Sequence, residues 1–214
     1  RSLVGSEMCI ETAFDVNPTS LDHIVISPKT SEITAGESQS YTVEAFDTYD
    51  NSISDVTTSA SFATTSEAKG SWEANTYTSE KAGSWIVTAT YLEKTDTSTL
   101  NVNPTELDHI VISPDTSTLN AGESISYSVE AFDTFNNSIS DVTTSASFTT
   151  TSEAGGSWEA NTYTSEKAGS WTVTATYLEK TDTATLNVNP AELDHIVISP
   201  KEAIIGMGDS EVYT

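Results

Sequence analysis

The chain has 214 residues, of which 32 are acidic and 8 are basic, so its formal net charge is −24. This excess of negative charge makes nucleic acid and anionic membrane surfaces poor partners. The single cysteine, Cys9, excludes a disulfide framework within the chain, and no apolar run reaches the length of a membrane span. The 31 Ser and 35 Thr residues predict a polar, hydrated surface.

One stretch, Leu-Asp-His-Ile-Val-Ile-Ser-Pro, occurs three times, beginning at Leu21, Leu107 and Leu193. The starts lie 86 residues apart (107 − 21 and 193 − 107), and a fixed period is the mark of a tandem array. Residues 21–106 and 107–192 differ at only 13 positions. The sequence therefore predicts two whole modules with part of a module at each end. The predicted segments are a last strand of a preceding module at 1–18, modules at 19–104 and 105–190, and the first strands of a following module at 191–214.

Within the first module, short strands alternate with turns. Tyr41, Val43 and Ala45 alternate with polar residues at period two, which predicts a strand with one buried face. Phe46 falls on the wrong face of that strand and indicates a β-bulge or a surface contact. The other predicted strands are 21–27, 56–62, 71–78, 85–91 and 100–102, with a polar hairpin at 93–96. Short strands of this number, without a helical period, predict an all-β fold, an antiparallel β-sandwich of immunoglobulin-like type.

At this point the sequence resembles a known group, the tandem immunoglobulin-like repeats of bacterial and archaeal cell-surface proteins, as in invasin- and intimin-type adhesins. The residues that carry the resemblance are Ala35-Gly36-Glu37-Ser38, Tyr41 to Asp47 with Asn51, Asp55-Val56-Thr57, Ala82-Gly83-Ser84-Trp85 and Val87-Thr88-Ala89. Val43 and Ala89 stand where antibody-type domains have a core cystine. The resemblance implies a surface-exposed repeat and names no surface partner.

A cluster of acidic and amide side chains follows the predicted strand at 41–45 in the first module and recurs at the matching loop of the second module. Because calcium takes about six to eight oxygen ligands, this loop and the linker before the second module form a candidate calcium site. The alternative is a solvated turn closed by Asx hydrogen bonds. The candidate ligands are Asp47, Asp50, Asn51, Asp55, Glu106, Asp108, Asp133, Asn136, Asn137 and Asp141.

Motifs of catalysis and of cofactor binding do not occur in the sequence, so we expect no enzymatic activity and no cofactor other than calcium. His23, His109 and His195 occupy one position of the repeat and are interpreted as packed or junction residues. The four tryptophans likewise recur as core positions. Asn136-Asn137-Ser138 is a glycosylation sequon that the first module lacks.

Two functions remain open after this reading. The first is an extracellular structural or adhesive protein, in which stacked modules form a rod that acts as a stalk, a filament or a component of a surface layer. The second is an accessory spacer array beside a secreted enzyme or a carbohydrate-binding domain. The expected partners are other cell-surface components and further copies of the chain, the latter through strand addition by residues around Ile10 to Val16. Their apolar character, with Met8, Cys9 and Phe14 nearby, motivates that idea.

Overall fold

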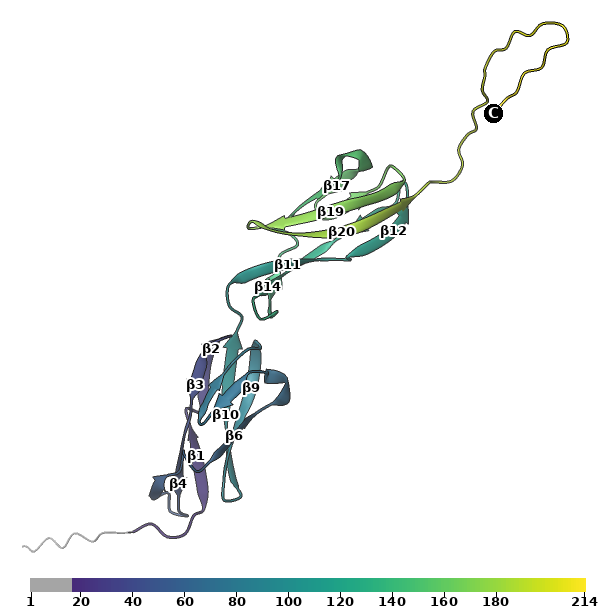
Figure 1. The fold of residues 1–214 in the computed structure, drawn as a ribbon. Helices are drawn as coiled ribbons and strands as arrows, with labels where there is room; N and C mark the ends of the chain where they lie inside the picture. Colours follow the sequence, from purple (N-terminus) through teal and green to yellow (C-terminus); the bar gives the residue numbers. More distant parts are fainter. Residues whose placement is uncertain (1–16) are drawn as a thin grey trace, which may run out of the picture. The chain divides into compact units, whose positions relative to one another are not determined.

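A computed structural model describes residues 17–214 of the chain. Each repeat contains ten strands and one short 3-10 helix, in the same order (Figure 1). In the first repeat these are β1 (His23–Ser27), β2 (Thr30–Thr34), β3 (Ser38–Ser40), β4 (Thr42–Phe46), β5 (Ser52–Asp55), β6 (Ser61–Thr64), η1 (Ser66–Ala68), β7 (Ser71–Glu73), β8 (Thr76–Thr78), β9 (Gly83–Tyr91) and β10 (Lys94–Asn103).

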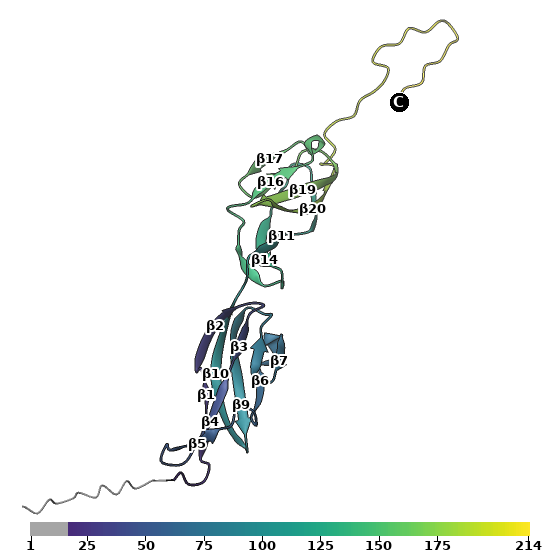
Figure 2. The ribbon, with the colours of Figure 1, turned by 60° about the vertical axis from the view of Figure 1, so that its left-hand side comes forward.

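The second repeat has the same elements one period later. They are β11 (Leu107–Ser113), β12 (Thr116–Asn120), β13 (Ser124–Ser126), β14 (Ser128–Asp133), β15 (Ser138–Asp141), β16 (Ser147–Thr150), η2 (Ser152–Ala154), β17 (Ser157–Glu159), β18 (Thr162–Thr164), β19 (Gly169–Tyr177) and β20 (Lys180–Asn189). Figure 2 shows the two sets of strands from a second direction.

The strands of the first repeat form three hydrogen-bonded groups: β1-β4-β5, β3-β8-β7 and β2-β10-β9-β6. The strands β3 and β4 follow one another along the chain, so the first two groups make up one face of a sandwich and the four-stranded group makes up the other. All pairs are antiparallel except β2 with β10, which is parallel. The predicted antiparallel sandwich is therefore confirmed with one parallel edge, because the chain changes sheets between β1 and β2.

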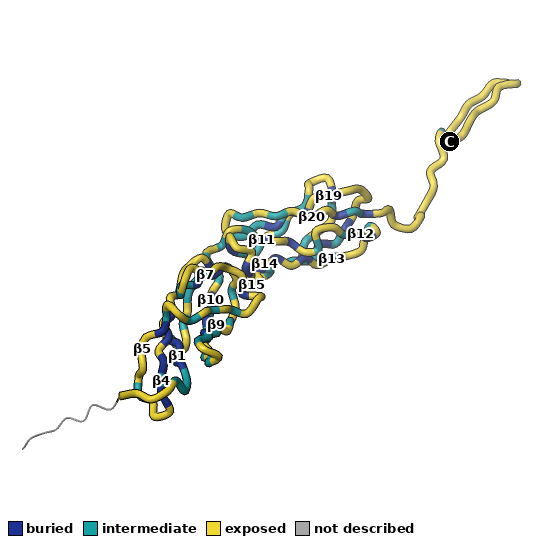
Figure 3. The backbone as a smooth tube through the Cα atoms, turned by 60° about the horizontal axis from the view of Figure 1, so that its bottom comes forward, coloured by how far each residue is buried: buried dark blue, intermediate teal, exposed yellow. Residues whose placement is uncertain are grey.

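Side-chain alternation explains why these segments form strands. Along β4, buried and exposed residues alternate, as Figure 3 shows for the backbone of both repeats. The hairpin of β9 and β10 pairs over nine residue pairs, from Lys94 with Tyr91 to Val102 with Gly83. Its inward residues, such as Val87 and Leu100, are fully buried. Period-two patterning and hairpin pairing thus position both sheets of the sandwich.

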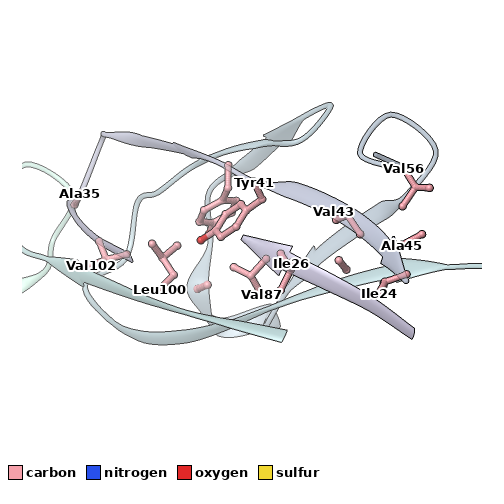
Figure 4. Close-up of a cluster of buried hydrophobic side chains, with 13 residues drawn as sticks. Ile24, Ile26, Ala35, Tyr41, Val43, Ala45, Val56, Val87, Leu100 and Val102 are labelled. Carbon is pink, nitrogen blue, oxygen red and sulfur yellow. The ribbon is translucent and has the colours of Figure 1, made fainter. Parts of the chain in front are cut away.

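The core of the first repeat lies between the two faces. Figure 4 shows Ile26, Val43 and Val87 pointing into the same interior, with Tyr41 and Leu100 beside them. All of these side chains are buried, as are their counterparts in the second repeat. The predicted buried face of the 41–45 strand is therefore confirmed. Trp72 and Trp85 pack against this core while remaining partly exposed.

Two of the predicted strands were wrong in detail. Residues 56–60 of the predicted strand at 56–62 form a turn, because Val56 donates its backbone N–H to Val43 while Ser59 and Ala60 donate theirs to Val56. The strands in this region are instead β5 and β6 on either side of the turn. The predicted strand at 71–78 is divided into β7 and β8, which pair with each other. The predicted irregularity at Phe46 is confirmed as a register shift between β4 and β5.

No strand follows β20 among the described residues, so the predicted first strands of a following module at 191–214 stay a prediction. Ser199 and Thr214 exchange both backbone hydrogen bonds at 3.0 Å, and the matching residues Ser27 and Thr42 are register partners in the pairing of β1 with β4. The described chain folds into two compact units. The first unit contains the residues up to His109 together with Ala131–Ser140. The second unit contains Ile110–Glu130 together with Asp141–Thr214. The predicted module boundaries are not tested by this division and stay predictions.

Replacing Lys69 by glycine is expected to stabilise the first repeat by about 1–3 kcal/mol. Lys69 directly follows η1 and has φ 52° and ψ −179°. Residues with a Cβ rarely adopt this backbone conformation. The matching residue of the second repeat is Gly155, with φ 66°. The converse variant Gly155→Lys should lose a similar amount. Urea unfolding of both variants measures the effect, and unchanged midpoints would contradict this explanation.

Candidate functional site

The loop between β4 and β5 is organised around one buried carboxylate, Asp47. Its Oδ1 accepts hydrogen bonds from the backbone N–H groups of Tyr49 and Asn51, at 2.9 and 3.0 Å. Its Oδ2 accepts from the backbone N–H of Thr19 at 2.9 Å and from the side chain of Asn51 at 3.2 Å. The carboxylate therefore ties the segment before β1 to the loop.

The second repeat repeats this arrangement around Asp133, which is also fully buried. Its Oδ1 accepts from the backbone N–H groups of Phe135 and Asn137, at 2.9 and 2.8 Å. Its Oδ2 accepts from the N–H of Thr105 and from the side chain of Asn137, both at 2.9 Å. A carboxylate offers about four acceptor positions, so these donors occupy the capacity of the group.

These hydrogen bonds stabilise the charged form of both carboxylates. The bond from the Thr19 N–H is the main cause that holds the pKa of Asp47 far below its ordinary value, and burial opposes it. Burial alone would raise the pKa of Asp133, but the bonds from the Asn137 side chain and the Thr105 N–H outweigh it and lower the pKa. Both groups are thus anions over the whole neutral and mildly acidic range.

The other predicted calcium ligands lie in different local settings. Asp55 and Asp141 each close an Asx turn, accepting at 2.8 Å from the N–H of Thr57 and of Thr143. Asp108 lies 3.0 Å from Nδ1 of His109. Asp50 and Asn136 have left-handed backbones, Asp50 lies 3.6 Å from His23 Nε2, and Glu106 donates its backbone N–H to Thr105.

No group of three or more His, Cys, Asp or Glu side chains suited to a metal ion occurs among residues 17–214. The calcium hypothesis is not tested by this geometry and stays a prediction. The observed bonds favour the alternative in part: the turns are closed by Asx hydrogen bonds, although Asp47 and Asp133 are buried and therefore not solvated.

We expect calcium to leave the melting temperature unchanged. Binding at Asp133 would have to displace N–H donors that are already paired, and those donors would lose their partners. Melting curves of chelated protein and of protein with added calcium measure this. A rise in melting temperature that disappears in Asp133→Asn and Asp141→Asn would establish the site instead.

Acid is expected to destabilise both repeats only below about pH 4. A group with a lowered pKa in the folded state contributes stability above its unfolded pKa, and that contribution is lost as the pH falls towards the folded pKa. The ordinary aspartate value here is 3.8. Urea midpoints should be level from neutral pH down to this value and then fall; a fall centred near pH 6 would contradict the account. The carboxyl groups with lowered pKa are Asp47, Asp55, Glu67, Asp96, Asp133 and Asp141.

The repeated histidines pack at the same end of each repeat as the carboxylate loop. The ring of His23 stacks on Phe46 with the centroids 5.4 Å apart, and His109 stacks on Phe132 at the same distance. This agrees with the interpretation of His23 and His109 as packed residues, whereas the side chain of His195 is exposed. The stacking also gives the bulged Phe46 a structural role, which is to cover the histidine ring.

The sequence analysis missed a second aspartate that accepts a hydrogen bond from a backbone N–H group, Asp96. Its Oδ2 accepts from the N–H of Ile26 at 2.8 Å and also pairs with Lys29. Asp182 accepts from the N–H of Ile112 in the same way at 2.9 Å. The sequence showed these aspartates only as part of a polar hairpin. Their recurrence at one repeat position was the available signal.

No family model matches this chain, and no curated protein matches it either. Similar solved structures include the Escherichia coli adhesin FdeC, with a TM-score of 0.45 and 17% identity over 84% of this chain and 68% of that chain. Domains 5–6 of the S-layer protein SbsC give 0.31 and 19%, over 80% and 98%. A tandem of titin immunoglobulin domains gives 0.36 and 11%, over 81% and 99%.

Overlaps of this size carry no argument about function, so the class of the chain rests on its own strands and sheets. The order of strands, the two packed faces and the hairpin of β9 with β10 define tandem immunoglobulin-like β-sandwiches. The predicted fold class is confirmed. No helix in residues 17–214 is long and apolar enough to cross a membrane.

Proposed function

We propose that this chain is part of an extracellular structural or adhesive protein, in which the repeats act as spacers of a stalk, filament or surface layer. The observation that carries the proposal is that aspartate side chains of each repeat accept hydrogen bonds from the backbone of the same repeat. Asp47, Asp96 and their counterparts bind backbone N–H groups of their own repeat. These aspartates therefore stabilise the fold of their own repeat.

The differences between the repeats support the same proposal. The two modules differ at 13 of 86 positions, and the fully buried residues Tyr41, Val43 and Leu100 recur unchanged as Tyr127, Val129 and Leu186. A module that only spaces its neighbours can be copied without diversifying its surface. The acidic, hydroxyl-rich surface keeps such a module soluble and hydrated outside the cell.

The alternative is an accessory spacer array beside a secreted enzyme or a carbohydrate-binding domain. Removal of one repeat of 86 residues from the native protein separates the two proposals. For a structural or adhesive protein, the height of the surface layer or the reach of the adhesive end should shorten, as seen by electron microscopy or by cell attachment. For an accessory array, cells should keep an unchanged surface and lose or shift only the activity of the attached domain.

The extended rod stays a proposal, and calcium binding stays an untested hypothesis. The residues expected to take part in strand addition, around Ile10 to Val16, lie outside the described residues. Strand addition therefore also stays a hypothesis. Deletion of residues 1–17 tests it. Strand addition predicts loss of assembly with both repeats still folded, whereas persisting filaments would exclude these residues as the donor.

A further inference from the structure

One outer face of the second repeat is built of threonine. Along β19 and β20, buried residues such as Val173 and Leu186 alternate with residues that point away from the core. The outward residues of the two strands are register partners of one another. The outward threonines, which we call the threonine face, are Thr172, Thr174 and Thr176 on β19 and Thr181, Thr183 and Thr185 on β20.

The neighbouring strands extend this face without adding a charge. The sheet has the order β12-β20-β19-β16 (Figure 1). Thr116 of β12 is the register partner of Thr185, and Thr149 of β16 is the partner of Thr174. Every described residue at an outward position of these four strands is Thr, Ser or Asn. The face is therefore uncharged, although the chain carries a net charge of −24.

The first repeat has the same strands but a different outer face. Three of the 13 differences between the repeats place an additional threonine on the sheet of the second repeat. The three pairs, first repeat before second, are Glu32 and Thr118, Ala63 and Thr149, and Ile86 and Thr172. Glu32 accepts a hydrogen bond from the Asn103 side chain at 2.7 Å, so the sheet also accommodates a carboxylate at this position. The uncharged face is therefore a property of the second repeat and not a requirement of the fold.

The hydroxyls of the threonine face differ in their bonding from other hydroxyls of the same repeat. Between β13 and β18, Ser124 pairs with Thr164 and Ser126 pairs with Thr162, each at 2.8 Å. Among the described residues, the side-chain hydroxyls of the threonine face have no such partner. Their donors and acceptors remain available to a molecule outside the repeat.

We propose that the threonine face of one copy of the chain packs against the same face of a second copy. A hydroxyl both donates and accepts hydrogen bonds, whereas a carboxylate only accepts them. A face of hydroxyls is therefore complementary to itself, as the two-fold contact of a homodimer requires. Charge favours the same face, because two acidic chains can meet there without opposing carboxylates. Two twisted sheets pack with their strands about 30° apart, so the twist of the sheet is compatible with the contact.

The size of the face makes this a weak pairing. The strands β12, β20, β19 and β16 have 5, 10, 9 and 4 residues. At about 3.3 Å per residue and ~4.8 Å per strand they cover about 440 Å², or about 900 Å² for two copies. Standard interfaces bury more than about 1,200 Å², so we expect transient dimers at concentrations up to about 1 mM. The pairing rests on the proposed structural role and names a second copy as a partner. A chain that stays monomeric would overturn the pairing and leave the spacing role intact.

Sedimentation equilibrium of the 214-residue chain at high salt, with reductant to prevent pairing through Cys9, tests the proposal. The wild-type chain should form dimers and nothing larger. Thr183→Glu places a charge inside the contact, where salt screens it little, and should abolish the dimer. Thr118→Glu introduces the residue of the first repeat and should shift dimer formation to higher concentration. Thr144→Glu is the matched control, because it adds the same charge at an exposed turn outside the face. It should dimerise as the wild type does.

Four outcomes would overturn the proposal. They are a wild-type chain that stays monomeric at about 1 mM, dimers of unchanged strength in Thr183→Glu, an equal loss in Thr144→Glu, and wild-type oligomers larger than dimers. A monomeric chain that is instead retained on a neutral polysaccharide matrix would assign the face to a sugar and overturn the pairing as well. Circular dichroism of each variant separates loss of the contact from loss of folding.

Discussion

Replacing Gly156 by alanine is expected to unfold the second repeat, with a loss of more than about 4 kcal/mol. Its Cβ would lie 2.3 Å from the backbone oxygen of Thr164 and 2.7 Å from the hydroxyl of Tyr163. The oxygen cannot withdraw, because Thr164 is paired with Ser124 and with Ser157 in the sheet β13-β18-β17. The glycine is therefore required by a close backbone approach as well as by its φ of +75°.

Gly122→Ala provides the matched control for this variant. Gly122 also has a left-handed backbone, with φ +92°, but a Cβ there would meet nothing within 4 Å. Its replacement should cost only the backbone strain, about 1–2 kcal/mol. Urea unfolding measures both losses, and hydrogen exchange of peptides, which differ between the repeats, shows whether each loss lies in the second repeat. Equal losses for the two variants would show that the close approach has no effect.

Replacing Trp158 by alanine is expected to cost about 3–5 kcal/mol. Its ring stacks on Phe148 at 5.4 Å and packs at an angle against Tyr127 at 6.0 Å and Tyr163 at 5.0 Å. Its indole N–H also donates to Thr150 Oγ1 at 3.1 Å. Removal of the ring leaves a cavity beside two buried tyrosines and removes a cluster of aromatic contacts.

Trp171→Ala is the comparison for this second prediction. Trp171 is also partly exposed, but its ring lies over Gly169 of its own strand and its N–H bonds the carbonyl of Lys167. Since its loss opens no cavity within the aromatic cluster, the cost should be clearly smaller. Thermal and urea unfolding measure both variants. A larger loss for Trp171→Ala would contradict the placement of the cluster at Trp158.

The sequence predicted those strands whose inward and outward residues alternate without interruption. The β4 and β9 strands belong to this group, because Val43 and Val87 occupy a simple period-two pattern. The region around Val56 was predicted wrongly for the same reason: Val56 and Phe62 resemble the ends of an alternating strand. In the fold, Val56 instead anchors a turn through its backbone bond to Val43, and patterning cannot distinguish these two uses of a buried valine.

The sequence indicated the loops of Asp47 and Asp133 as a candidate calcium site, which stays a prediction, but it did not show the hydrogen bonds that these carboxylates accept. Several acidic and amide oxygens close together indicated a cation, and the residue types supported that hypothesis. The donors that Asp47 and Asp133 accept from are mostly backbone N–H groups, which every residue type except proline provides. No sequence signal therefore separates a metal-binding aspartate from one that closes its own loop.

Labelling of intact cells that express the native protein tests the proposed surface location most directly. Antibodies raised against the folded second repeat should label unbroken cells, and the signal should change little after lysis. Brief protease treatment of the same cells should remove it, while an internal marker protein remains intact. Labelling that appears only after lysis, and survives protease on unbroken cells, would contradict the account that these repeats are spacers on a cell surface.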